Sequence, residues 1–233
     1  PCGDYVEIVR VGDSNKYGMN DRSVNTPSGV GIWNNNDDGN RIQFFAVENV
    51  YAEAPELVAS SSELTGATYY YMQFKTGGAV VEDKGAGNNA QTANKVNKKE
   101  QLWAFIGTNL TSLKAINKAG RYLSYSDDRY KTVAEEDDAV TFELRQSTAH
   151  PGYFELVNAG ASQAMNQVSG TGAGRNLGVY TIGNDNNPFK VVLPPAPVEP
   201  IFYNDANAAA GDEWYYMQFC KDSFNWKAPS TVG

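Results

Sequence analysis

The sequence contains few cysteines and histidines, which are common catalytic and metal-binding residues. It has two cysteines and one histidine in 233 residues. Cys2 and Cys220 stand near opposite ends in no metal-like spacing, so they either pair or are both free. His150 precedes Pro151, and no serine or cysteine motif makes it the base of a triad. We therefore expect neither catalysis nor a metal or cofactor.

Basic residues and long apolar runs are also scarce. The 19 lysines and arginines are outnumbered by 27 acidic residues, which gives a net charge of −8 and a pI near 4.7. Such a surface repels phosphate backbones and anionic lipids, so we expect no nucleic-acid partner. No apolar run approaches the ~18 residues that cross a bilayer, so no membrane insertion is expected.

The N-terminus has neither the charged nor the apolar region of a signal peptide, and we expect the chain to start after any such segment. Heavy use of Asn, Gly, Tyr and Thr with few charges is typical of a secreted or cell-surface protein.

What the sequence does contain is a strand-rich unit written three times between residues 69 and 193. Each third closes with an aromatic residue, Trp103, Phe142 or Phe189, at spacings of 39 and 47 residues. A glycine-centred turn precedes each of them, at 77–78, 120 and 160, between short runs of alternating apolar and polar residues. This pattern predicts hairpins with one buried face, and a period of about forty residues indicates a symmetric array. We expect the three aromatics to lie in the core.

The triplet Gln101-Leu102-Trp103, together with this repeat, resembles the ricin-type β-trefoil lectins, whose three lobes each end in such a triplet. Residues 70–74, 79–83 and 100–103 look like the trefoil modules of secreted bacterial carbohydrate-active proteins. Only one of the three triplets is intact. The resemblance covers about half the chain and implies an all-β fold, with a complete β-trefoil at 68–193.

The two ends of the chain copy parts of this unit. Residues 19–20 and 31–33 match 165–166 and 178–180 at offsets of 146 or 147, and residues 215–219 match 70–74 at an offset of 145. We therefore expect residues 1–50 to be the last third of a preceding trefoil and 213–233 the first strands of a following one. Residues 51–67 and the proline-rich 194–212 are predicted to be linkers. The partial trefoil segments would pack on the central unit, pack on each other, or self-associate with a second copy.

The resemblance also implies shallow sugar sites, each built from a polar side chain, an aromatic platform and an amide. In the third lobe and its N-terminal copy, the corresponding residues are Asn166, Tyr180, Asp185, Asn187, Asn20, Asp21, Trp33 and Asn40. The family usually has Asp where Asn166 and Asn20 stand. As an alternative, Tyr180 and Trp33 could be half-buried packing residues, and Asn187 and Asn40 could cap turns.

The other two lobes lack an aromatic at the platform position. The first offers Asp83 or Glu82 as the polar group, but has 92–93 where the aromatic should be. The second offers residues 126–127 as the polar group, but has 133–134 where the aromatic should be; Tyr130 is a possible replacement for the platform. Residues 34–40 resemble the start of a calcium loop, yet its twelfth position is Phe45 and not Glu, which favours a plain turn.

These observations lead to two hypotheses. The first is a non-catalytic carbohydrate-binding module region that anchors a secreted or surface protein to oligo- or polysaccharide glycans. The second is a structural or adhesive spacer with decayed sugar sites, which binds protein partners.

Overall fold

The computed structural model describes residues 7–8, 17–21, 30–34, 40–46, 50–158, 161–198 and 215–219. The chain divides into two compact units, one formed by Pro1–Glu48 with Pro195–Gly233 and the other by Asn49–Pro194. The described elements are β-strands and short 3-10 helices. No helix in these ranges is both long and apolar enough to cross a membrane.

The second unit contains three lobes of four strands each. The first lobe consists of β6 (Tyr71–Phe74), β7 (Val80–Glu82), β8 (Gln91–Ala93) and β9 (Trp103–Asn109). The second consists of β10 (Ser112–Asn117), β11 (Tyr122–Ser126), β12 (Arg129–Val133) and β13 (Phe142–Gln146). The third consists of β14 (Phe154–Asn158), β15 (Gln163–Gln167), β16 (Leu177–Thr181) and β17 (Phe189–Leu193). The 3-10 helices are η2 (Ser61–Gly66), η3 (Lys99–Gln101) and η4 (Glu136–Asp138).

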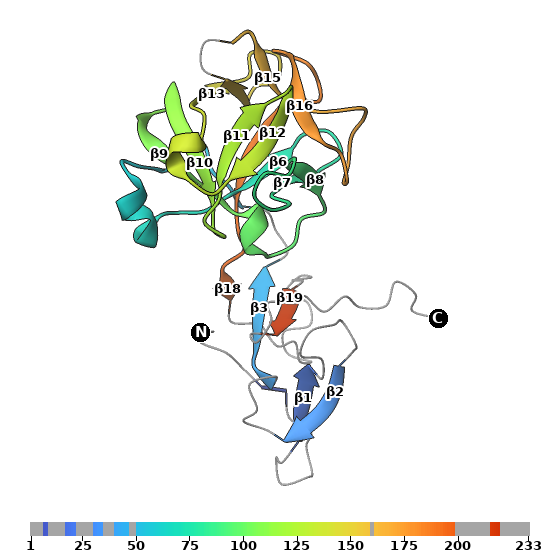
Figure 1. Cartoon of the computed structure of the whole chain (residues 1–233). Coiled ribbons are helices and arrows are strands. Elements are labelled where there is room, and N and C mark those ends of the chain that lie inside the picture. Colours follow the sequence, from blue (N-terminus) through green and yellow to red (C-terminus); the bar gives the residue numbers. More distant parts are fainter. Residues whose placement is uncertain are drawn as a thin grey trace. The chain divides into compact units, whose positions relative to one another are not determined.

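The first and last strands of the lobes close into a barrel (Figure 1). Among the described residues, antiparallel pairing runs from β6 through β17, β14, β13 and β10 to β9. Tyr70 and Trp103 close the ring, because each donates its N–H to the carbonyl oxygen of the other at 2.8 Å. The inner strands of each lobe form the hairpins β7–β8, β11–β12 and β15–β16. This barrel with three hairpins is the predicted β-trefoil.

The three aromatics of the repeat lie in the core, as predicted. Trp103, Phe142 and Phe189 are the first residues of β9, β13 and β17, and each is fully buried. The indole N–H of Trp103 donates to the carbonyl oxygen of Val81 at 3.1 Å, so the ring is buried without an unsatisfied donor. The Phe189 and Phe74 rings pack edge to face, with their centroids 6.2 Å apart. Burying each such ring contributes about 2–3 kcal/mol.

Residues 51–67 are not a linker, contrary to the sequence prediction. The short strand β5 (Leu57–Val58) pairs in parallel with β9, and β4 (Val50–Tyr51) pairs with β17. The backbone N–H of Glu56 donates to the Tyr70 hydroxyl at 3.0 Å, and Leu64 packs against the core. A few apolar residues in a polar stretch are enough to dock this segment on the barrel.

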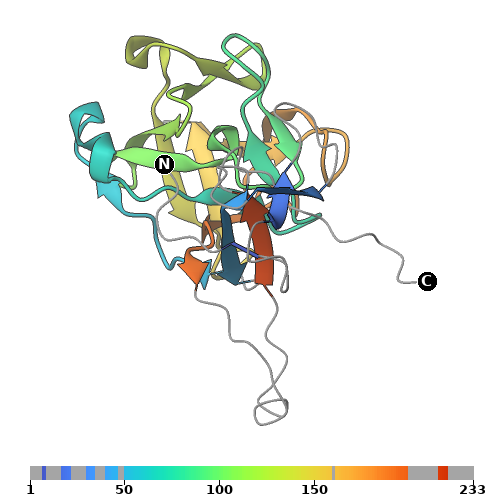
Figure 2. The ribbon, with the colours of Figure 1, turned by 90° about the horizontal axis from the view of Figure 1, so that it is seen from below.

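In the first unit, the two ends of the chain pair with each other. Strand β3 (Ile42–Ala46) lies between β18 (Pro197–Val198) and β19 (Tyr215–Phe219), seen beside each other in Figures 1 and 2. The pair Phe219 and Ile42 repeats the register of Phe74 and Phe189 in the complete trefoil. Residues 194–212 therefore contain a paired strand as well as prolines. Cys2, Cys220 and residues 35–39 of the suspected calcium loop lie outside the described residues.

One buried carboxylate ties the first lobe to the second. Asp83 is 3% exposed and accepts hydrogen bonds from Thr132 Oγ1 at 2.6 Å, the Gly85 N–H at 2.6 Å and Asn117 Nδ2 at 2.7 Å. The Arg121 guanidinium also donates to it. Burial by itself raises the pKa of Asp83, but these donors outweigh it and hold the pKa below its usual value.

Replacing Asp83 by Asn should therefore destabilise the second unit by about 3 kcal/mol at neutral pH, because Arg121 would lose its buried partner. Since the folded-state pKa is lowered, the stabilisation is complete above about pH 5 and is lost as the pH falls through ~3.9 towards the folded-state value. Urea unfolding from pH 7 to pH 3 measures both effects. The Asp83→Asn curve should depend less on pH than the wild-type curve.

The control is Asp137→Asn, which changes the same group at an exposed position of η4. Equal stability of the two variants at pH 7 would contradict the tie between the lobes.

Candidate functional site

The β15–β16 hairpin presents one aromatic side chain outwards. Its register places Tyr180 opposite Ala164 and Asn166 opposite Gly178. Met165 points into the core and is fully buried, whereas the ring of Tyr180 stands beside a small residue and is 55% exposed. The half-buried packing role is therefore disfavoured for Tyr180.

The side-chain amide of Asn166 is held by two other asparagines. Its Nδ2 donates to Asn187 Oδ1 at 2.6 Å and to Asn184 Oδ1 at 3.1 Å. Asn187 Nδ2 in turn donates to the carbonyl oxygen of Thr181 at 2.8 Å. This last bond fixes the orientation of Asn187, which fixes that of Asn166. Both amide hydrogens of Asn166 are used inside the protein, so its Oδ1 is the group left for a ligand.

Asn166 and Tyr180 line one open pocket of about 450 Å³. The lining also includes Gln167 and Ser169 from the third lobe and Arg129 from the second. A single hairpin does not form this pocket, because the β11–β12 turn supplies one side of it.

Residues of the first lobe hydrogen-bond to the third-lobe strand and loop next to the pocket. Thr92 Oγ1 donates to the carbonyl oxygen of Gly172 at 2.6 Å and accepts from the Arg175 N–H at 2.9 Å. Gln167 Nε2 donates to the carbonyl oxygen of Thr76 at 2.9 Å. The loop between β15 and β16 is thus fixed to another lobe, and the pocket is formed before any ligand arrives.

The N-terminal copy reproduces this geometry in the first unit. In the hairpin of β1 (Tyr17–Asp21) and β2 (Val30–Asn34), Gly18 lies opposite Trp33. Asn20 Nδ2 donates to Asn40 Oδ1 at 2.6 Å, and Asn40 Nδ2 donates to the Asn34 carbonyl oxygen at 2.7 Å. Trp33 is 50% exposed. The matching residues of the two units therefore make the same hydrogen bonds.

The remaining predicted site residues occupy different surroundings. Asn40 and Asn187 are fully buried, which favours the turn-capping role over direct contact with a ligand. Asp185 does not line the pocket, and its carboxylate lies 3.1 Å from His150 Nε2. Asp21 is the last residue of β1, next to Asn20.

Sequence reasoning missed Arg129 and Asn184. Asn184 stands in an asparagine-rich turn, where composition cannot tell which amide bonds to Asn166. Arg129 belongs to the second lobe, so comparing positions lobe by lobe could not assign it to a third-lobe pocket.

In the first lobe, the residue equivalent to Asn166 is Glu82, and Asp83 belongs instead to the tie between lobes. Gln101, the first residue of the closing triplet, donates from Nε2 to Glu82 Oε2 at 2.6 Å. Burial raises the pKa of Glu82, but the donors Lys84, Lys98 and Gln101 outweigh it and keep the pKa low. Ala93 occupies the register position of Tyr180, so this lobe has no platform.

The second lobe lacks the platform, and its polar group differs. Ser124 takes the polar position, and its hydroxyl donates to the Asp138 carbonyl oxygen at 2.9 Å. Val133 takes the platform position. The suggestion that Tyr130 stands in as a platform is wrong, because its ring is fully buried and stacks on Phe142 at 5.8 Å.

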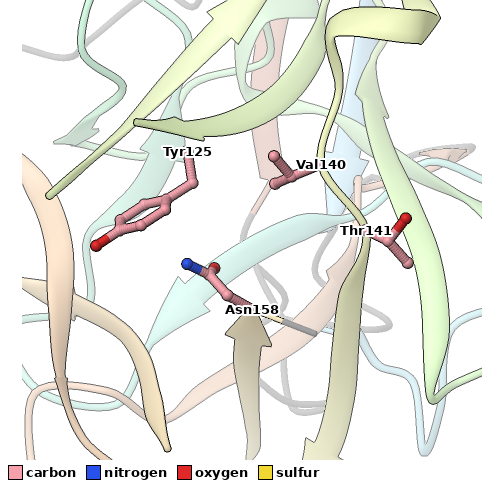
Figure 3. A pocket seen from close by; sticks show the side chains of 4 residues that line it. All are labelled: Tyr125, Val140, Thr141 and Asn158. Atoms are coloured by element: carbon pink, nitrogen blue, oxygen red, sulfur yellow. The ribbon is translucent and has the colours of Figure 1, made fainter. Parts of the chain in front are cut away.

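A second pocket, of about 400 Å³, lies between β11 and the end of β14. It is lined by Tyr125, Val140, Thr141 and Asn158, and the Asn158 amide points towards the Tyr125 ring (Figure 3). The Tyr125 hydroxyl already donates to Asp128 Oδ1 at 3.1 Å, and Asn158 Oδ1 already accepts from Tyr130 at 2.8 Å. This pocket therefore offers a ligand fewer polar groups than the third-lobe pocket. Among the described residues, no cluster of histidine, cysteine and acidic side chains could hold a metal ion.

No family model and no curated protein matches the sequence. The chain does resemble solved β-trefoil structures. The designed protein ThreeFoil is 19% identical over 53% of this chain and 97% of its own, with a TM-score of 0.47. The Macrolepiota procera ricin B-like lectin, solved in complex with lactose, is 15% identical; the match covers 54% of this chain and 95% of the lectin, with a TM-score of 0.48. The Rhizoctonia solani agglutinin is 16% identical; the match covers 55% of this chain and 95% of the agglutinin, with a TM-score of 0.45. This likeness concerns the fold, which the barrel and its hairpins establish independently.

The Asn166 network predicts the effect of restoring the usual acidic residue. Asn166→Asp should destabilise the second unit by about 2–4 kcal/mol at pH 7, because a carboxylate cannot donate and would face two amide oxygens. Those surroundings favour the protonated acid, which can donate, so the loss should shrink below about pH 4. Urea unfolding at pH 7 and pH 4 gives the comparison. Gln163→Glu, at the exposed end of the same strand, is the control and should change little. A fully stable Asn166→Asp variant at pH 7 would contradict the assigned amide orientations.

Proposed function

We propose that this chain is a non-catalytic carbohydrate-binding region whose glycan sites are the third-lobe pocket and the equivalent hairpin of the N-terminal copy. The observation that carries the proposal is an exposed aromatic ring beside a hydrogen-bonded amide, found at equivalent positions of the two units. Tyr180 with Asn166 and Trp33 with Asn20 are the two pairs. A single exposed aromatic needs no explanation, but one that recurs at the equivalent position of both units, next to the same pair of hydrogen-bonded asparagines, supports a contact surface.

This combination suits a sugar. The apolar C–H face of a pyranose packs on an aromatic ring, and the Asn166 oxygen accepts a hydrogen bond from a ring hydroxyl. A site this open buries little of its ligand and binds weakly. Two such sites in one chain raise the overall avidity by ~10²–10⁴ when both reach the same glycan. In this proposal the region anchors a larger secreted or surface protein to a polysaccharide.

The spacer hypothesis is the second candidate, and one observation favours it. Ala93 and Val133 replace the platform in two of the three lobes of the complete trefoil. If the third lobe does not bind sugar either, the unit would serve as a stiff module that binds proteins.

Replacing Tyr180 by Ala should lower glycan affinity roughly tenfold or more and change the free energy of unfolding by less than about 1 kcal/mol. The measurements are a glycan array and urea unfolding, with lactose and the asialo-GM1 saccharide among the neutral probes. Trp33→Ala should act in the same way on the site of the first unit.

Tyr51→Ala is the matched control, because Tyr51 is a tyrosine of similar exposure outside the pocket. A large loss of stability in Tyr180→Ala would show that the ring serves folding. Wild-type protein that binds no glycan would favour the spacer, and protein partners would then be sought.

A further inference from the structure

The third-lobe pocket contains one charged group, and it is positive. Among the lining residues, Arg129 is the only one with a formal charge at neutral pH, and none is acidic. The whole chain carries a net charge of −8, so a pocket without a carboxylate differs from the average surface. A lone cation in a binding pocket attracts an anionic ligand.

The backbone turn and a close packing contact position Arg129. Asp127 and Asp128 form the β11–β12 turn with φ values of 53° and 57°, which gives the tight reversal of a two-residue hairpin. Arg129 Nη1 donates to the Asp128 carbonyl oxygen at 2.7 Å. Gly178 packs so closely against this turn that a Cβ there would lie 3.0 Å from that oxygen and 3.4 Å from Nη1. The guanidinium is therefore held against the strand position opposite Asn166.

The carboxylates nearest in sequence are engaged elsewhere. Asp127 pairs with Lys131 at 2.7 Å, and Asp128 Oδ1 accepts from the Tyr125 hydroxyl at 3.1 Å. Within the described part of the chain, the Arg129 guanidinium forms no ion pair, and its one hydrogen bond is the contact with the Asp128 carbonyl oxygen. A guanidinium has five N–H donors, so most of them are available to a ligand.

We propose that this pocket selects glycans that carry an anionic group, a carboxylate or a sulfate ester, next to the sugar ring that stacks on Tyr180. This inference rests on the proposed carbohydrate-binding function and names its ligand class. Arg129 binds the anion through paired N–H donors, Asn166 accepts from a hydroxyl, and Tyr180 supports the ring. Arg129 is thus a specificity residue that comes from a neighbouring lobe.

The test measures affinity by calorimetry for glycan pairs that differ only in charge. The pairs are a glucuronide with its glucoside, sialyllactose with lactose, and a 6-sulfated galactoside with its parent. The wild type should bind at least one acidic member about tenfold more tightly than its neutral partner, and this preference should shrink as salt rises from about 0.05 to about 0.5 M. The carboxylate and sulfate pairs show which anion is preferred.

Three variants locate the effect. Arg129→Gln should abolish the preference of the wild type for the acidic member of a pair, whereas Tyr180→Ala should weaken the binding of both members of each pair and keep the preference. Arg145→Gln is the control, because its guanidinium pairs with Glu143 on β13 and does not line the pocket. It should behave as wild type.

Equal affinity of the wild type for both members of every pair would overturn the anion preference but leave the carbohydrate-binding function intact. So would a preference that survives in Arg129→Gln. If no glycan of either class binds, the proposed function itself fails, and this inference fails with it.

Discussion

Closure of the barrel is the constraint on which the rest of the second unit depends. Tyr70 and Trp103 complete the ring through a reciprocal pair of backbone hydrogen bonds, and the Trp103 side chain fills the space behind them. A closed barrel leaves no strand edge among its members. Each lobe contributes its first and last strands to the barrel and its inner strands to a hairpin, so the three hairpins have equivalent residue positions. Sequence changes within a hairpin can then alter what it offers without altering where it lies.

The three lobes show what such freedom allows. At one equivalent position, the first lobe has Glu82, the second Ser124 and the third Asn166. In the first, the closing amide donates to a carboxylate, whereas in the third, the closing amide accepts from another amide. The direction of the hydrogen bond has reversed while the backbone register has not. The asparagine in the third lobe therefore belongs to a matched pair and is not an isolated loss of charge.

Much of the fold could be predicted from the sequence, because its signals are local and repeated. The spacing of Trp103, Phe142 and Phe189 reflects burial at equivalent barrel positions, and a constant offset reflects equal hairpin registers. Residues 51–67 were mispredicted as a linker because their two short strands have too few apolar residues to produce a pattern. Their pairing depends on barrel strands far away in the sequence.

The site was predictable only in part, for a related reason. Tyr180, Trp33 and the two buried asparagine pairs follow from positions within one lobe. The exposure of the rings and the direction of the amide bonds depend on neighbours that a sequence does not display. Arg129 enters the pocket from the second lobe, and Thr92, which holds the β15–β16 loop, belongs to the first. A pocket assembled across lobe boundaries cannot be read from any one repeat.

The frame of asparagines around the third-lobe pocket contains no ionisable side chain. Asn166, Asn184 and Asn187 exchange hydrogen bonds only among themselves and with the backbone. A carboxylate in the same place would gain or lose a proton as the surroundings became more acidic, and its ligand contacts would change with it. The three asparagines therefore keep the same hydrogen-bond donors and acceptors at every pH at which the unit stays folded.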